Sequence, residues 1–289
     1  MQDFDYARPA TIEDAVAVMG NDGARALAGG TDLIPQMREG RRHVACVVDL
    51  KGIPELTSIA ARADGSLVLG AAASAFSVAS HLAVASAYPA VARSARLIGS
   101  LQVQNRASLG GNICNAAPSA DAVPALICHQ ASVRVVGPNG SRDELLETFV
   151  RGPGKTTLAP GELLLSIVLP PITPRSAGTY LRFTPRREMD IAIAGTAAWV
   201  RLDAESRIAE ARVTLASVGP TPIRATSAEQ HLISKRPASA LFEAAGRLAA
   251  GDARPISDTR GSADYRRSLV AVLTARALAE CCAALQEQV

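Results

Sequence analysis

Two glycine pairs, about eighty residues apart, constrain what this chain can fold into more than any other feature of its sequence. The first lies in Leu27-Ala28-Gly29-Gly30-Thr31-Asp32-Leu33 and the second in Ser108-Leu109-Gly110-Gly111-Asn112. In both segments apolar residues come first, and a small polar residue follows the glycines, which predicts a strand-like approach that ends in a loop. Glycine has no Cβ and tolerates unusual φ values, so backbone N–H groups at such a loop can converge on phosphate oxygens. The two pairs together predict two loops that bind one diphosphate.

Length and composition predict a folded protein of about two domains and exclude some kinds of partner. The chain has 289 residues, of which 48% are hydrophobic and 20% charged, which is ordinary for a globular protein. Its 30 basic and 27 acidic residues give a net charge of only +3, and no long basic tract is present to follow a nucleic-acid backbone. Aromatic residues make up 3%, too few for a platform that stacks bases. We therefore expect no nucleic-acid partner.

The N-terminal segment and the cysteines bear on location and metal binding. Residues 1–6 contain neither a basic nor an apolar region of the secretory type, and no run of eighteen apolar residues occurs, which predicts a cytoplasmic protein without a membrane span. The cysteines are odd in number, with no C-x-x-C, and the four histidines are isolated. We expect free thiols and no metal site. The cysteines are Cys46, Cys114, Cys128, Cys281 and Cys282.

The first part of the chain alternates between strand-like and helical segments. A helix is predicted over 11–19, with Thr11 and Asp14 in a capping pattern, and it lies between strands that end at Leu27 and cover 43–50. This order predicts a small α/β lobe over about 1–55, followed by a second lobe over 56–174. Further strands are predicted at 67–71, 133–136 and 163–169, and helices at 88–98 and 122–128.

A proline cluster over 170–174 marks the predicted boundary between a first domain, 1–174, and a second domain, 175–289. Beyond it, two strands over 191–202 and 209–218 are joined by a hairpin at 203–206. Helices are predicted over 225–232, 238–249 and 263–285. Strands followed by helices are typical of an α+β domain.

The second glycine pair lies in a segment rich in short polar residues, and two other nucleotide motifs are excluded. Ser108, Asn112, Asn115 and Asp121 supply groups that can hydrogen-bond phosphate and ribose. The segment 154–156 ends like an NTPase phosphate loop, but Phe149 stands where that loop requires glycine. No G-x-G-x-x-G follows a strand, so the sequence does not indicate a Rossmann dinucleotide domain.

The segment from Ser108 to Asn112, followed by Pro118 and Asp121, resembles the flavin signature of the FAD-binding medium subunits of molybdenum hydroxylases. That family includes the carbon monoxide dehydrogenase, nicotinate dehydrogenase and xanthine dehydrogenase types. The segment 27–33 is similar to the other pyrophosphate loop of the family, and the resemblance extends almost end to end. Further matches in the same order are 152–156, 162–170 and 186–190.

The resemblance implies a fold of the α+β class: a two-lobed FAD-binding domain of the vanillyl-alcohol oxidase type, then a smaller α+β C-terminal domain. It implies a diphosphate between the two glycine loops, ribose or adjoining diphosphate at Asp121, and an isoalloxazine ring bordered by Asp190 and Ile191. The implied cofactor-binding residues are Ala28, Gly29, Gly30, Thr31, Asp32, Leu33, Ser108, Gly110, Gly111, Asn112, Asp121, Leu164, Arg182, Asp190 and Ile191.

This sequence departs from the family pattern at three positions. Arg182 stands where many members have lysine, which keeps the charge but changes the geometry. Ser108 replaces a frequent threonine and keeps the hydroxyl group. Gln104 replaces a frequent arginine, and the resemblance implies that the loss of this charge alters flavin affinity or a subunit contact.

The function that the resemblance implies is that of one subunit of an oxidoreductase. The chain would bind FAD and pass electrons from iron–sulfur clusters on a small subunit to NAD, a quinone or oxygen, while substrate is hydroxylated on a large molybdopterin subunit. Because the flavin performs the redox chemistry, no catalytic acid, base or nucleophile is assigned to this chain. Two alternatives remain: a free-standing FAD-dependent oxidoreductase of the same flavin fold, and a flavin-free scaffold subunit.

Overall fold

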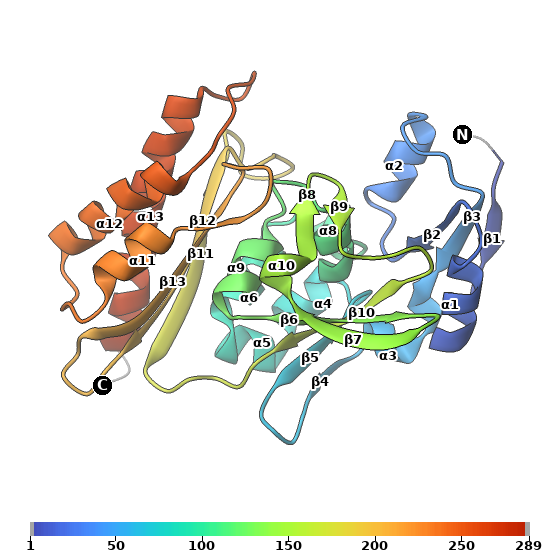
Figure 1. The fold of residues 1–289 in the computed structure, drawn as a ribbon, viewed down its shortest axis with the longest axis horizontal. Coiled ribbons are helices and arrows are strands. Elements are labelled where there is room, and N and C mark those ends of the chain that lie inside the picture. Colours follow the sequence, from blue (N-terminus) through green and yellow to red (C-terminus); the bar gives the residue numbers. More distant parts are fainter. Residues whose placement is uncertain (1–2, 287–289) are drawn as a thin grey trace.

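The computed structural model describes residues 3–286, so the first two and last three positions of the predicted domains lie outside the described residues. The chain begins with a three-stranded parallel sheet in the order β1-β3-β2. Its strands are β1 (Asp5–Ala7), β2 (Ala24–Leu27) and β3 (Cys46–Asp49), and its helices are α1 (Ile12–Met19) and α2 (Leu33–Arg38). In Figure 1 this blue lobe lies at the right-hand end of the molecule.

A second lobe is built on a five-stranded antiparallel sheet in the order β4-β5-β10-β6-β7. The strands are β4 (Ile59–Ala61), β5 (Leu67–Gly70), β6 (Ser132–Gly137), β7 (Gly140–Leu145) and β10 (Leu163–Leu169). A two-stranded sheet of β8 (Val150–Gly152) and β9 (Lys155–Thr156) adjoins it. The helical elements are η1 (Leu50–Gly52), α3 (Pro54–Thr57), α4 (Ala75–Ser80), α5 (Leu82–Ala87), α6 (Pro89–Arg96), α7 (Leu101–Gln104), α8 (Leu109–Asn115), α9 (Ala122–Cys128) and α10 (Leu146–Phe149).

The last part of the chain is a four-stranded antiparallel sheet in sequence order, covered on one face by three helices (Figure 1). The strands are β11 (Ser176–Phe183), β12 (Ala194–Leu202), β13 (Ile208–Ala216) and β14 (Ile223–Arg224). The helices are α11 (Thr226–Leu232), α12 (Ser239–Asp252) and α13 (Ala263–Gln286). Helices α6 and α9 of the second lobe pack against β11, β12 and β13, so the sheet is buried between helices on both faces.

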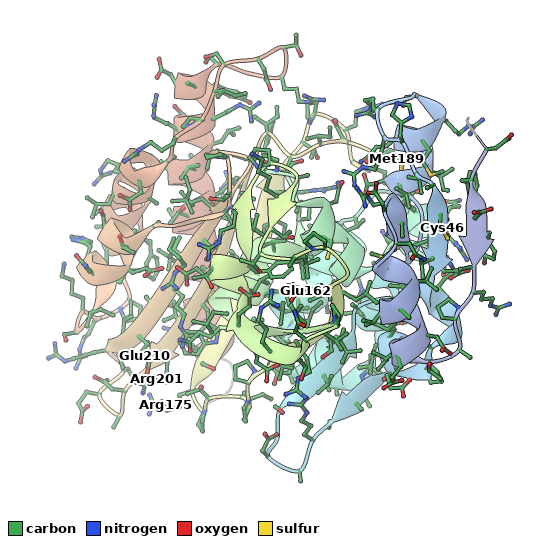
Figure 2. The ribbon with its side chains drawn as sticks, turned by 45° about the vertical axis from the view of Figure 1, so that its right-hand side comes forward. Cys46, Glu162, Arg175, Met189, Arg201 and Glu210 are labelled. Carbon is green, nitrogen blue, oxygen red and sulfur yellow. The ribbon has the colours of Figure 1, made fainter. Side chains whose placement is uncertain are left out.

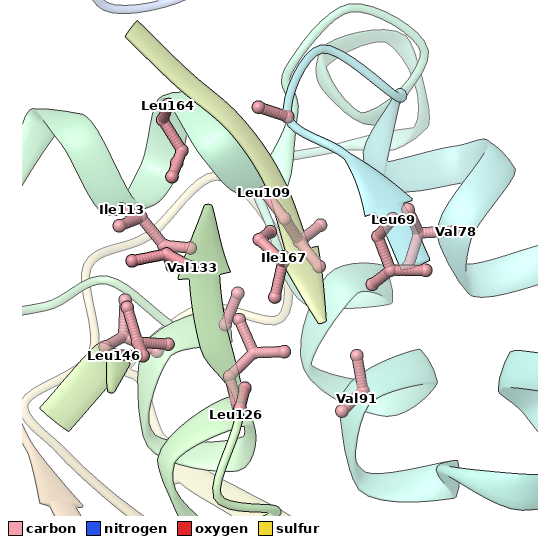
Figure 3. Close-up of a cluster of buried hydrophobic side chains, with 14 of the residues drawn as sticks. Leu69, Val78, Val91, Leu109, Ile113, Leu126, Val133, Leu146, Leu164 and Ile167 are labelled. Carbon is pink, nitrogen blue, oxygen red and sulfur yellow. The ribbon is translucent and has the colours of Figure 1, made fainter. Parts of the chain in front are cut away.

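One apolar core joins the second lobe to the inner face of the C-terminal sheet. It includes Leu69 of β5, Leu126 of α9 and Ile167 of β10, which converge in Figure 3. Tyr180 and Trp199 of the C-terminal sheet belong to the same cluster. A separate cluster fills the space between the sheet and α11, α12 and α13.

Most elements predicted from apolar periodicity are confirmed. The Oγ1 of Thr11 accepts a hydrogen bond from the N–H of Asp14 at 3.1 Å and caps α1, and α9 and β10 begin and end as predicted. The strand β11 was not predicted. It directly follows the proline cluster, and its sequence SAGTYLRF lacks a clear alternation of apolar residues. Its partner β12 supplies the pairing that makes it a strand.

The predicted loop at the second glycine pair is wrong. Gly110 and Gly111 lie in the first turn of α8 and not in a loop that ends a strand. The Oγ of Ser108 accepts a hydrogen bond from the N–H of Gly111 at 3.0 Å, which caps the helix. This cap, together with packing against a neighbouring segment of the same chain, outweighs the poor helix propensity of two glycines.

Among residues 3–286, α13 is the one helix with the length and composition that could cross a membrane. It packs against α12, β11 and β12, and Val270, Ala277 and Leu278 are fully buried there. These apolar residues serve the core of the C-terminal domain, so α13 gives no support for a membrane span.

Candidate functional site

A cleft of about 550 Å³ lies where the two glycine segments meet. Loop residues from the first lobe form one side, and the start of α8 with residues up to Asp121 forms the other. Residues 189–191, from the loop between β11 and β12, complete the rim. Of the predicted site residues, those that line the cleft are Ala28, Gly29, Gly30, Thr31, Asp32, Leu33, Ser108, Gly111, Asn112, Asp121, Asp190 and Ile191.

The side chain of Lys51 stabilises the first loop, which contains Gly29 and Gly30. The Nζ of Lys51 donates to the carbonyl oxygen of Ala28 at 2.9 Å and to Oδ1 of Asp49 at 2.6 Å. Gly30 has a φ of +75°, which lets the chain turn sharply into α2, where the N–H of Ile34 donates to the carbonyl oxygen of Gly30. These contacts fix the loop to the rest of the first lobe.

The second loop is the capped N-terminus of α8. The short bridge between Ser74 and Ser108 and the bond from the N–H of Ala75 to the carbonyl oxygen of Ala107, at 2.7 Å, hold the residues that precede the helix. The N–H groups at a helix N-terminus carry partial positive charge and suit an anion. The half-buried Asn112 accepts a bond from the N–H of Ala122 through Oδ1 at 3.4 Å, which ties the helix to the next wall of the cleft.

Within each pair, one glycine serves the packing of the protein itself. A Cβ on Gly29 would overlap the backbone of Arg106 and Ala107, so this glycine lets the two loops touch each other. A Cβ on Gly110 would overlap the backbone of Ala71, and the N–H of Gly110 donates to the carbonyl oxygen of Ala71 at 3.1 Å. Gly110 faces the core and does not line the cleft. Gly111 is exposed in the cleft, and a Cβ there would meet only the Oγ of Ser108, at 3.1 Å.

A buried polar cluster closes the cleft behind Asp121. Its carboxylate accepts a hydrogen bond from the hydroxyl of Tyr180 at 2.8 Å and forms an ion pair with Arg182. Burial raises the pKa of Asp121 to about 6, although Arg182 and Tyr180 act in the opposite direction. Burial also raises the pKa of Tyr180 well above its ordinary value, so that hydroxyl keeps its proton and remains a donor. Arg182 thus orients Asp121 and does not itself line the cleft.

Leu164 lies outside the cleft. It is 4% exposed in β10 and belongs to the apolar core of the second lobe, as Figure 3 shows. Gly110, Leu164 and Arg182 are therefore the three predicted residues that the fold does not place on the cleft surface.

Several cleft residues were not predicted as site residues. The amide Nε2 of Gln36, on α2, donates to Oδ1 of Asn115 at 3.3 Å and bridges the two sides of the cleft. Cys114 also lines the cleft, and burial raises the pKa of its thiol to about 12. The sequence gives a reason to expect Asn115 in the site, since it is one of the short polar residues after the second glycine pair. It gives no reason to expect Gln36 there, because only the fold brings α2 to α8.

The rim loop is shaped by its own side chains. The carboxylate of Asp190 accepts hydrogen bonds from the N–H of Arg186 at 3.0 Å and of Ile191 at 2.9 Å. Met189 has a φ of +53°, and its N–H donates to the carbonyl oxygen of Gly99 at 3.3 Å. Exposed side chains of Met189 and Ile191 therefore stand at the mouth of the cleft.

Comparison with known proteins shows the family to which the chain belongs. Residues 2–172 match the family model described as the FAD binding domain in molybdopterin dehydrogenase, and residues 179–281 match the CO dehydrogenase flavoprotein C-terminal domain. The chain belongs to this FAD-binding family.

Relatives and solved structures agree over nearly the whole length. The chain is 33% identical to a xanthine dehydrogenase FAD-binding subunit of Escherichia coli O157:H7 over 287 residues, which is 98% of each chain. It is 31% identical to the carbon monoxide dehydrogenase medium chain of Hydrogenophaga pseudoflava, over 95% of this chain and 96% of the other. A solved structure of carbon monoxide dehydrogenase from that organism superposes with a TM-score of 0.93 at 30% identity, covering 98% of both chains. The family and the two-domain FAD-binding fold inferred from sequence are confirmed.

The geometry fits FAD, the cofactor of this family. The cleft volume lies within the range of cofactor sites, and two fixed loops face each other across it. Gly30 and Gly111 are open to the cleft, so a phosphate group can approach the backbone at both. The chain is thus the FAD-binding subunit of an oxidoreductase of the molybdenum hydroxylase family.

Proposed function

We propose that this chain is the electron-transferring flavoprotein of a three-subunit molybdenum hydroxylase. FAD, when bound, would accept electrons from iron–sulfur clusters on a small subunit and deliver them to a soluble acceptor such as NAD, a quinone or oxygen. Substrate would be hydroxylated on a large molybdopterin subunit. The observation that carries the proposal is the joint cleft of the two glycine segments in a chain that matches such flavoproteins from end to end.

The residues of this chain would bind and orient the cofactor. Backbone N–H groups at Gly30 and at the start of α8 would hold the diphosphate, and each hydrogen bond to a charged oxygen contributes roughly 1.5–3 kcal/mol. Asp121, held by Tyr180 and Arg182, would accept hydrogen bonds from hydroxyl groups of the ribose, next to the diphosphate. Asp190 and Ile191 would border the ring at the open mouth of the cleft.

The rim is the proposed route for electrons in and out of the bound flavin. Met189 and Ile191 are 56% and 45% exposed, so the mouth of the cleft is not covered by this chain. An acceptor or a partner subunit could approach the flavin there. We also propose a cytoplasmic location, which agrees with five cysteines that are all free thiols.

The test is purification of the tagged chain from its native host, followed by measurement of flavin, iron and molybdenum in the eluted complex. We expect all three to co-elute with two further subunits in a fixed ratio. A yellow chain that elutes alone and oxidises a substrate by itself would support a free-standing oxidoreductase instead. A colourless chain that takes up no FAD would support a scaffold subunit.

A further inference from the structure

A second pocket lies between the two domains, at the end of β11 opposite to the flavin cleft. It has a volume of about 350 Å³ and is bounded by the start of α6, the end of α9, the proline cluster and the first residues of β11. Arg182, near the other end of β11, holds Asp121 at the flavin cleft. Gly178 in the pocket and Arg182 are four residues apart along the strand, about 13 Å. In Figure 2, Arg175 of this pocket lies far from Met189 of the cleft rim.

A histidine in this pocket has a buried nitrogen without a partner. His129 is 8% exposed, and its Nε2 has no hydrogen-bond partner among the described residues. Burial, together with the charge of Arg212, lowers the pKa of His129 to about 4, so the imidazole is neutral at pH 7. A neutral imidazole carries one N–H, and with the proton on Nε2 it is a donor. Buried polar atoms normally have a partner, so this nitrogen indicates a missing one.

The buried Nε2 lies against residue 178, which is glycine. A Cβ at Gly178 would lie 3.2 Å from Nε2 of His129 and 3.2 Å from Cδ1 of Trp199. The φ of Gly178 is not in the left-handed region, so the backbone does not require glycine there. Glycine keeps a methyl group from pressing against the unpartnered nitrogen and the ring of Trp199.

The charges around the pocket favour an anion. Arg175 and Arg212 line the pocket, and no aspartate or glutamate is among the described residues that line it. The guanidinium of Arg212 lies 3.8 Å from the ring centre of Trp199 and pairs with Glu210, which Arg201 also contacts. One carboxylate therefore serves two arginines. Arg175 forms no ion pair within the part of the chain that the structure describes, and it stands at the edge with Arg201 and Glu210 in Figure 2.

The walls favour a planar ligand of one ring. Tyr88 packs edge-on against the ring of His129, with centroids 5.4 Å apart, and the hydroxyl of Tyr88 is already engaged by the carbonyl oxygen of Pro170. Trp199 and the prolines of the cluster form further apolar walls. The pocket volume is near the lower limit for small-molecule sites, which suits a single ring.

We propose that this interdomain pocket binds a small planar carboxylate, whose oxygen accepts a hydrogen bond from Nε2 of His129 and whose charge is stabilised by Arg175 and Arg212. The ligand would touch α6 and α9 of the first domain and β11 of the second at the same time. It would therefore stabilise the contact between the two domains.

The experiment is calorimetric titration of benzoate into the FAD-saturated protein, with the flavin spectrum recorded in parallel. We expect one benzoate per chain with no change in the flavin spectrum. Benzamide, which lacks the charge, and cyclohexanecarboxylate, which lacks the planar ring, should each bind at least tenfold more weakly. Absence of benzoate binding would overturn the proposal, because a water molecule would then be the partner of His129.

Variants locate the binding site. His129→Phe keeps a ring against Tyr88 but removes Nε2, and Gly178→Ala fills the space beside it, so both should weaken benzoate binding at least tenfold. Arg175→Gln should weaken it about threefold. The matched controls are Arg236→Gln, an exposed arginine elsewhere, and Gly111→Ala in the flavin cleft, and both should leave benzoate affinity unchanged.

Thermal melting shows which variants fold, and His129→Phe and Gly178→Ala test the same site from two sides. Benzoate affinity that is unchanged in a folded His129→Phe protein, or lost in Gly111→Ala, would place the binding elsewhere and refute the proposal. Equal affinity for benzamide and benzoate would refute the role of charge.

Discussion

The two glycine segments look alike in sequence and differ in structure. The first, around Gly29 and Gly30, is a loop between β2 and α2, and the second, around Gly110 and Gly111, is the first turn of a helix. In each, one glycine is required by the packing of the protein and the other is open to the cleft. The order is the same in both pairs: a Cβ would overlap neighbouring backbone at Gly29 and Gly110 but not at Gly30 and Gly111, and Gly29 lines the cleft as well.

A Gly-Gly pair at a cofactor site therefore has two separable functions. The first glycine brings chain segments together, and the second leaves room for the ligand or sets the turn. Alanine at each of the four positions tests this division, from the largest expected effect to the smallest.

Gly29→Ala should have the largest effect. The new methyl group would overlap the backbone of Arg106 and Ala107, and Ala107 is fixed on both sides by hydrogen bonds of 2.7 Å to Val103 and Ala75. We expect a loss of about 3 kcal/mol or more in the free energy of unfolding, measured by urea denaturation. Gly251→Ala, on α12 with nothing within 4 Å, is the control and should not destabilise the protein.

Gly110→Ala should also destabilise the fold, by about 2–3 kcal/mol. The methyl group would overlap Ala71 and break the 3.1 Å hydrogen bond to its carbonyl oxygen. The glycine motif taken by itself predicts that Gly110→Val would leave a folded but flavin-poor protein, because a β-branched side chain would fill the approach of the phosphate. The structure instead predicts that flavin is lost together with stability, and a stable Gly110→Ala protein without FAD would contradict this.

Gly30→Ala should cost about 1–2 kcal/mol, because residue 30 has a φ of +75°. Gly30→Asn separates backbone strain from crowding, since asparagine meets the same neighbours at Cβ but tolerates left-handed backbone better. Denaturation curves should show a smaller loss for asparagine than for alanine. The opposite order would assign the effect to contacts with Leu27 and Ile34.

Gly111→Ala should change stability by less than about 0.5 kcal/mol, because alanine favours the helix and only the Oγ of Ser108 lies nearby. Its effect should appear in the cofactor: titration of FAD into the apoprotein should give an affinity about tenfold lower than for the unchanged chain. If FAD bound to Gly111→Ala with full affinity, the phosphate would not pass over this residue.

The sequence determined the parts of this protein that depend on neighbours along the chain. The capping pattern of Thr11 and Asp14, the apolar run of β10 and the helical repeat of α13 each require only local spacing. The same is true of the glycine motifs, whose resemblance to a flavoprotein family identified the cofactor and twelve of the residues that line the cleft.

Only the tertiary structure decided which of those residues line the cleft. Leu164 and Gly110 lie in flavin motifs but point into packed backbone or core, and Arg182 acts through Asp121. Gln36 pairs with Asn115, 79 positions away in the chain, and Gly178 lies against His129, 49 positions away. Contacts of that kind depend on how sheets and helices pack, and no local pattern in the chain encodes them.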